Sequence, residues 1–153
     1  MKDQTVYIFD ARMTQYAEGQ EIVRRVAVLG NKSLSHLAEA VLSAFDFECD
    51  HCYGFYGDVT KHPGREQTEV YELFVDAGED TVNENAKGVR STKISSVFAE
   101  AGKKMLFVFD YGDDWRFEVE LKEIREKFSA ERLPNVLTSV GVAPPQYPVL
   151  DEE

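Results

Sequence analysis

The order of apolar and polar residues predicts two opening strands followed by a helix. Residues 5–13 and 20–29 are rich in β-branched and aromatic side chains and flank a polar stretch at 15–19, a pattern typical of an antiparallel pair. After Ser33, a residue type favoured as a helix N-cap, apolar residues recur at helical spacing. The apolar face comprises Leu34, Leu37, Ala38, Val41, Leu42 and Phe45. We expect this helix to pack that face on the sheet.

The middle of the chain alternates short apolar segments with polar loops. Residues 52–56 and 68–75 are apolar and predict two further strands. Residues 76–91 have almost no apolar side chains, which predicts an exposed, mobile loop. A short second helix is predicted over 93–101, with Thr92 as its N-cap.

Residues 104–121 have the pattern of a β-hairpin. Residues 105–109 are apolar at every position, as in a central strand covered on both faces, whereas 115–121 alternate, as in a strand with one buried face. Gly112 and Asp113 between them match a two-residue type II′ turn. This turn would place the two strands in a defined register.

In that register Asp110 lies opposite Trp115 and shares its face of the sheet, so its carboxylate points towards the core at the end of the sheet. A buried carboxylate needs partners, because burying an unpaired charge costs several kcal/mol. The candidates are turn amides, the Trp115 indole N–H and an arginine. Arg24 and Arg25 alternate along the predicted second strand, so only one of them can point inward.

Two interpretations of Asp110 follow. In one, Asp110 is an Asx-type turn residue, and Arg24 or Arg25 is its structural ion-pair partner. In the other, Asp110, Asp113 and Asp114 supply oxygen ligands to a hard cation. The spacing of these acids matches no recognised ligand pattern, so they are weak candidates and no metal site is predicted.

Cys49 and Cys52 form a C-x-x-C sequence, the spacing of a redox dithiol or of half a zinc site. The chain has no other cysteine, and the motif follows a helix where a thioredoxin-type motif would open one, so structural cysteines are expected. His51, between them, is either a hydrogen-bonded structural histidine or a site residue at the mouth of a groove.

Composition narrows the class of protein. The chain has 153 residues, 17 Lys+Arg and 28 Asp+Glu, a net charge of −11, which suits a single domain and argues against direct binding to duplex DNA. It shows no long apolar run or export signal, and two cysteines make no disulfide framework, so we expect a cytoplasmic protein that does not enter a membrane. Phosphate-binding loops, dinucleotide fingerprints and serine nucleophile elbows are absent, so no cofactor is predicted.

Several segments together resemble the plasmid pRiA4b ORF-3-like family, also known as the insertion-element passenger TnpR family. Residues 109–115 (FDYGDDW) resemble its Y-D-F-G-D-x-W signature, and residues 47–55 place His51 at the family's histidine. The other matching segments are Arg24-Arg25, residues 34–37 and the PPQYP run at 144–148. The resemblance implies a mixed α+β domain without an established activity. Its link to plasmids and insertion elements is one of gene context.

We therefore expect one α+β domain over residues 1–153: a mainly antiparallel, twisted sheet of about six strands with one long and one short helix packed on it. The favoured hypothesis is a non-enzymatic binding or interaction domain with a polar-aromatic groove at the end of the sheet, whose partner is a protein or a small ligand. The candidate groove residues are Arg24, Arg25, His51, Asp110 and Trp115.

Two alternatives stay open. One is a metal-assisted hydrolase that uses the aspartate cluster and His51. The other is a mobile-element accessory protein that contacts nucleic acid or a nucleic-acid-binding partner.

Overall fold

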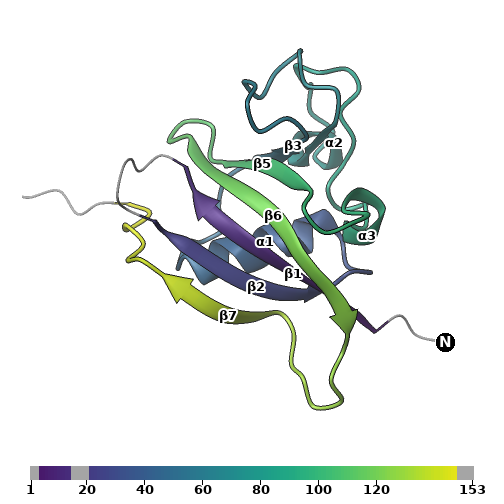
Figure 1. Ribbon diagram of the computed structural model, residues 1–153. Helices are drawn as coiled ribbons and strands as arrows, with labels where there is room; N and C mark the ends of the chain where they lie inside the picture. The colour runs from purple at the N-terminus through teal and green to yellow at the C-terminus, as the bar shows by residue number, and fades with distance from the viewer. Residues whose placement is uncertain (1–3, 15–20, 148–153) are drawn as a thin grey trace, which may run out of the picture.

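The computed structural model describes residues 4–14 and 21–147, which form one sheet with helices on it (Figure 1). The elements in chain order are β1 (Thr5–Met13), β2 (Val23–Leu29), α1 (Leu34–Ala44), β3 (Tyr53–Tyr56), β4 (Val70–Glu72), α2 (Leu73–Asp76), α3 (Ile94–Val97), β5 (Lys104–Phe109), β6 (Trp115–Glu126) and β7 (Asn135–Val140). The sheet has seven strands in the order β4-β3-β5-β6-β1-β2-β7, and every neighbouring pair is antiparallel. The predicted α+β class is confirmed.

The first helix forms as predicted. Ser33 caps α1, because its side chain accepts a hydrogen bond from the amide of His36. All six residues of the predicted apolar face are buried. Figure 1 shows α1 lying across one face of the sheet. The first predicted strand also forms over the expected residues as β1, and the second is shorter at its start, as β2. The polar stretch 15–19 lies outside the described residues.

The core lies between α1 and the sheet and is rich in aromatic rings. Phe45, just after α1, packs on Phe117 of β6 with ring centroids 5.0 Å apart, and Phe9 of β1 meets Phe98 edge-on at 4.8 Å. Each of these four rings is almost fully buried. Burial of one such side chain contributes about 1.5–3 kcal/mol, so this layer supplies much of the favourable free energy of folding.

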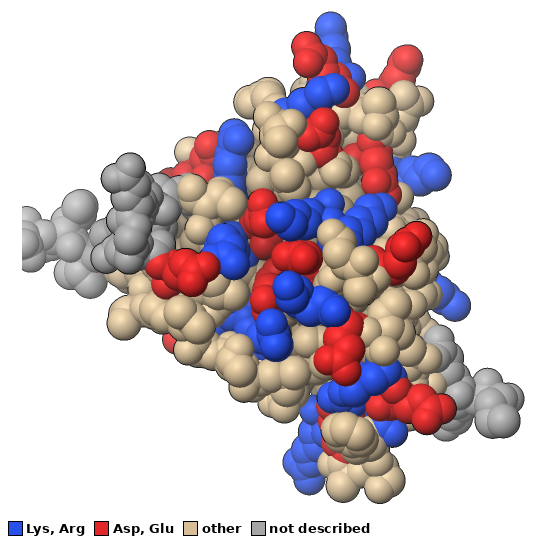
Figure 2. Space-filling model, in the orientation of Figure 1, with Lys and Arg blue, Asp and Glu red and all other residues tan. Residues whose placement is uncertain are grey.

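The opposite face of the sheet carries charged side chains at its centre. Figure 2 shows this face, where lysine and arginine side chains are interleaved with aspartate and glutamate. Asp10 of β1 pairs with Arg25 of β2 at 2.7 Å, and Lys104 of β5 lies 3.5 Å from Glu118 of β6. The excess of acid therefore forms no continuous acidic patch on this face.

Two predicted elements differ in their extent or type from the structure. Residues 68–75 divide into β4 and the short helix α2. The helix predicted over 93–101 is limited to α3, and Thr92 does not cap it, because its hydroxyl donates to the carbonyl of Gly88 instead.

The segment 76–91 is only partly exposed. Asn83 and Val89 are 5% and 0% exposed. The Asn83 side chain donates to the backbone carbonyl of Gln67, and the carboxylate of Asp76 accepts the amide of Val89. These contacts fasten the segment to the rest of the fold, so the prediction of full exposure is wrong there; its mobility stays a prediction.

The hairpin between β5 and β6 has a longer turn than predicted. Phe109 pairs with Trp115, so five residues form the loop and every β5 partner shifts by one position. Asp110 and Asp114 both take a left-handed backbone conformation, with φ of 61° and 57°. Aspartate tolerates this conformation better than most residues, and it ends the strand before a two-residue turn can form.

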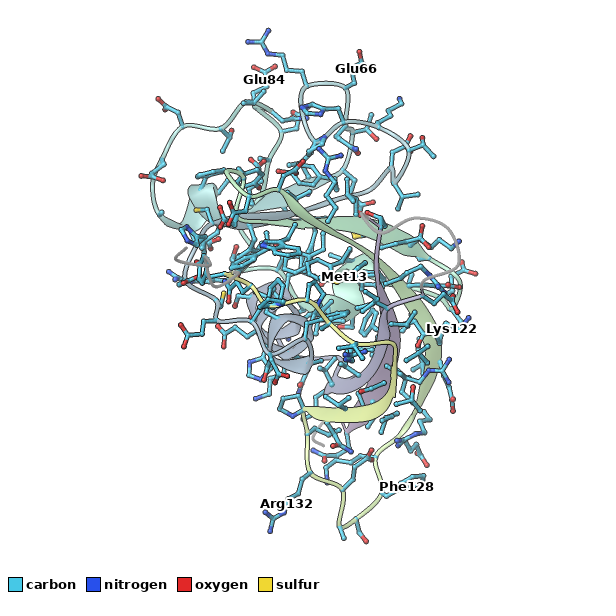
Figure 3. All side chains as sticks on the ribbon, turned by 90° about the vertical axis from the view of Figure 1, so that its left-hand side faces the viewer. Met13, Glu66, Glu84, Lys122, Phe128 and Arg132 are labelled. Atoms are coloured by element: carbon cyan, nitrogen blue, oxygen red, sulfur yellow. The ribbon has the colours of Figure 1, made fainter. Side chains whose placement is uncertain are left out.

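The long dimension of the molecule separates two sets of loops. Figure 3 shows Glu66 and Glu84 at one end, and Phe128 and Arg132, in the β6–β7 connection, at the other. Among the described residues, no helix is long and apolar enough to cross a membrane.

Candidate functional site

An open groove of about 450 Å³ lies beside α1, where the chain enters β3. Its lining residues are Ser35, Glu39, Ser43, Phe47, Cys49, His51, Tyr53, Leu73 and Arg90. Ser35, Glu39 and Ser43 are four residues apart, so they form one stripe along α1. The amide of Ser35 donates to the carbonyl of Val89, which sets Arg90 at the N-terminal end of this stripe. The groove thus combines one wall of hydroxyls and a carboxylate with a guanidinium at its end.

The two formal charges on these walls are available to a ligand. In the part of the chain that the structure describes, neither Glu39 nor Arg90 has an oppositely charged side chain as partner. Burial raises the pKa of the Tyr53 phenol above its ordinary value, so its hydroxyl stays protonated at neutral pH. Tyr53 can therefore donate a hydrogen bond within the groove.

His51 joins the groove to a small polar cluster at the end of the sheet. Its Nε2 atom lies 2.9 Å from the hydroxyl of Tyr147, 3.5 Å from Oδ2 of Asp110 and 3.8 Å from Oδ1 of Asp50. The Tyr147 hydroxyl donates to Asp50 at 2.9 Å, which leaves its oxygen to accept from His51. Loss of solvent around the phenol and this bond to Asp50 raise the pKa of Tyr147 to about 12.

Gln146 fastens the C-terminal segment to the loop before β3. Its amide oxygen accepts the backbone N–H of Glu48 at 2.7 Å, and its amide nitrogen donates to the Glu48 carbonyl and to Asp50, each at 3.1 Å. Gln146 is only 8% exposed. In the sequence, the resemblance of residues 144–148 to the family's C-terminal ending is the signal that points to this segment. That resemblance predicts no role for Gln146 or Tyr147.

Asp110 is buried at the end of the sheet, and its partners are turn amides. Its Oδ1 atom accepts the N–H groups of Gly112 and Asp113, both at 3.2 Å. The indole nitrogen of Trp115 is buried and has no hydrogen-bond partner among the described residues. Of the three expected kinds of partner, the turn amides are therefore the ones that bind Asp110, as in the Asx-type interpretation.

The arginines lie elsewhere, so the prediction that one of them partners Asp110 is wrong. Arg24 Nε donates to the carbonyl of Ala44 at 3.1 Å, at the C-terminal end of α1. Arg25 pairs with Asp10 on the opposite face. The strand order explains the error, because β6 and β1 separate β2 from β5. Neither arginine lines the groove.

The aspartates after β5 do not converge on a common point. Asp114 accepts a hydrogen bond from Arg116 Nε at 2.9 Å, and Asp113 is exposed. Within the described residues, no three side chains of histidine, cysteine, aspartate or glutamate are placed to hold a metal ion. The structure thus offers no ligand set built on Asp110, Asp113 and Asp114.

The cysteines are poorly suited to thiolate chemistry. Desolvation, followed by the nearby carboxylates of Glu39 and Asp50, raises the pKa of Cys49 to about 11. Desolvation also raises the pKa of Cys52. Because the thiolate is the reactive form, both side chains are protonated and weakly nucleophilic at neutral pH.

The antiparallel sheet, the single long helix and the groove between them define a class of small α+β domain. Residues 6–147 match the plasmid pRiA4b ORF-3-like protein family, and the chain belongs to this family. The fold is similar to the crystal structure of MM3350, a protein of unknown function from Methanosarcina mazei Go1, with 18% sequence identity, a TM-score of 0.71, and coverage of 90% of this chain and 71% of that one. No curated protein matches the chain.

Proposed function

We propose that this protein is a non-enzymatic binding domain, and that its groove holds a small ligand carrying both an acidic and a basic group. The observation that carries the proposal is a pair of charges in one groove, Arg90 and Glu39, that have no oppositely charged partner among the described residues. Arg90 would hold the acidic group, because a guanidinium matches a carboxylate in a two-point contact. Glu39, one helical turn beyond Ser35, would hold the basic group.

The rest of the lining supports binding more than catalysis. The thiol of Cys49 is held in its protonated form. His51 is engaged by the Tyr147 hydroxyl, which is itself bonded to Asp50. Ser35 shares its hydroxyl hydrogen bond with Ser33 at 2.7 Å, which gives it no base to activate it as a nucleophile. The groove volume lies within the range of small-molecule sites.

Thermal-shift and calorimetric titration with three matched sets of compounds tests the proposal. The sets are α-amino acids, the corresponding carboxylates without the amine, and the corresponding amines without the carboxylate. We expect binding by members of the first set, and we expect Arg90→Ala and Glu39→Gln each to weaken it about 10-fold, or about 1.4 kcal/mol. Arg132→Ala and Glu84→Gln, exposed and away from the groove, serve as controls.

Two results would contradict this function. One is a panel in which no zwitterionic compound binds. The other is a zwitterionic compound that binds with the same affinity to the wild-type chain, to Arg90→Ala, to Glu39→Gln and to the two controls. A stabilising response to divalent metal ions in the same thermal-shift series would instead favour the metal-dependent alternative.

A further inference from the structure

The two edges of the sheet differ in how they are protected. At one edge, β4 has three residues, and residue Lys87 covers it: the Lys87 amide donates to Val70 and its carbonyl accepts the amide of Glu72. At the other edge, β7 has six residues, all exposed, and the described residues place no strand beyond it. An open strand edge is a template for pairing with another chain.

The β7 edge also lacks the charges that usually block such pairing. Residues 133–147 contain no charged side chain, although 29% of the whole chain is charged. Val136, Leu137 and Val140 are 42%, 38% and 48% exposed. A bulge makes Leu137 the extra residue opposite β2, after which regular pairing continues from Thr138 to Val140. Natural proteins commonly protect edges with lysine, and β7 has none.

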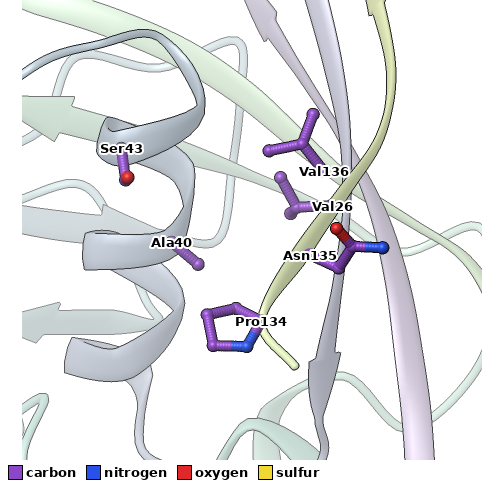
Figure 4. Close-up of a pocket in the computed structure, with 6 residues that line it drawn as sticks. All are labelled: Val26, Ala40, Ser43, Pro134, Asn135 and Val136. Carbon is purple, nitrogen blue, oxygen red and sulfur yellow. The ribbon is translucent and has the colours of Figure 1, made fainter. Parts of the chain in front are cut away.

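A hollow of about 70 Å³ lies beside this edge on the α1 face. Figure 4 shows Val26 and Val136 on neighbouring strands, with Ala40 of α1 across from them and Pro134 at the start of β7. Four of its six lining residues are apolar, namely Val26, Ala40, Pro134 and Val136. A side chain from a strand added at this edge would fill it.

Net charge indicates which partner fits. The chain carries −11, so two copies repel each other least where they meet through a surface without charge. Residues 133–147 are such a place. A basic foreign partner would gain most by binding acidic residues, and this edge has none to offer it.

We propose that two copies of this chain pair through β7, antiparallel about a two-fold axis, so that the sheet continues from one copy into the other. Antiparallel pairing of one strand with its own copy satisfies a two-fold axis, because each copy presents the same residues. This dimer goes beyond the proposed ligand site. The groove lining includes no β7 residue, so either proposal can fail without the other.

Light scattering and sedimentation of the full chain over a range of concentrations test the dimer. We expect a species of twice the chain mass at micromolar concentration, and amide hydrogen exchange across 135–140 that slows as concentration rises. The double variant Leu137→Lys, Val140→Lys should raise the dimer dissociation constant at least about 10-fold, because lysines on a pairing edge oppose strand addition.

Val82→Lys is the control, since Val82 is 66% exposed and lies between α2 and α3, outside β7. Circular dichroism and ligand titration of each variant report whether it keeps the fold and the groove. A chain that is monomeric at all concentrations would overturn the proposal. So would a dimer that survives both lysines, or one that Val82→Lys disrupts equally.

Discussion

On the face of the sheet that α1 covers, Phe107 and Phe117 on adjacent strands pack with ring centroids 5.6 Å apart. On the opposite face of the same strand β6, the alternate position carries Glu118, which lies 3.5 Å from Lys104. Strand β6 thus contributes aromatic side chains to the core on one face and charged side chains to the solvent on the other. Exclusion of water makes contacts on the first face costly to lose, whereas solvent replaces most of what is lost on the second.

The largest expected effect comes from the aromatic face. Phe117→Ala removes a fully buried ring that contacts Phe45 and Phe107, and we expect it to lower the free energy of unfolding by about 3–5 kcal/mol. Chemical denaturation measures the change. Phe128→Ala is the control, because Phe128 is 65% exposed and its loss leaves no cavity. Equal losses in the two variants would show that the covered face is not the dominant one.

An intermediate effect is expected at the end of the sheet, where the two environments meet. Asp110→Ala leaves the turn amides of Gly112 and Asp113 without their charged acceptor and should cost about 1–3 kcal/mol. Asp110→Asn keeps an oxygen acceptor and tolerates the left-handed backbone, so it should cost less. Thermal or chemical denaturation compares the two. If the asparagine variant loses as much as the alanine variant, the charge facing His51 is what matters.

The smallest effect is expected on the charged face. The hydrogen bond from Arg25 lowers the pKa of Asp10, so this pair contributes stability above the unfolded-state pKa of Asp10, and the contribution is lost as pH falls through the lower folded-state pKa. The Arg25 side chain is 39% exposed, so we expect only about 0.2–1 kcal/mol.

Comparison of the wild-type chain with Asp10→Asn across pH 2–7 measures this contribution. The difference in unfolding free energy should be present at pH 6 and should fade at the acidic end of the range. A difference that persists unchanged at the lowest pH would mean that packing, and not the charge of Asp10, accounts for it.

Much of the sheet and the long helix could be predicted from local pattern. The α1 face follows directly from residue spacing, because the helix buries one regular side, and β1 follows from its β-branched and aromatic residues. β7 was missed for the converse reason: all six of its residues are exposed, so no burial period appears in its sequence. The hairpin register was missed because Asp110 adopts a backbone conformation that residue order alone does not reveal.

The site was harder to predict than the fold. His51 was identified in the sequence and lines the groove, and whether it contributes to function stays a prediction. Glu39 and Arg90 were missed because 51 positions of sequence separate them, and they come together through backbone contacts of Val89 and Thr92 with the start of α1. The prediction of Arg24 and Arg25 as groove residues was wrong, because the residue pattern of one strand does not reveal which strands lie beside it.

By itself the sequence determined the class of fold and the buried face of α1, since both depend on local periodicity and on the cost of leaving apolar surface in water. Tertiary structure decided the strand order, the partners of both arginines, the lining of the groove and the exposure of the β7 edge. These depend on contacts between residues far apart in the chain. Such contacts are set by how the layers pack, and local patterns do not encode them.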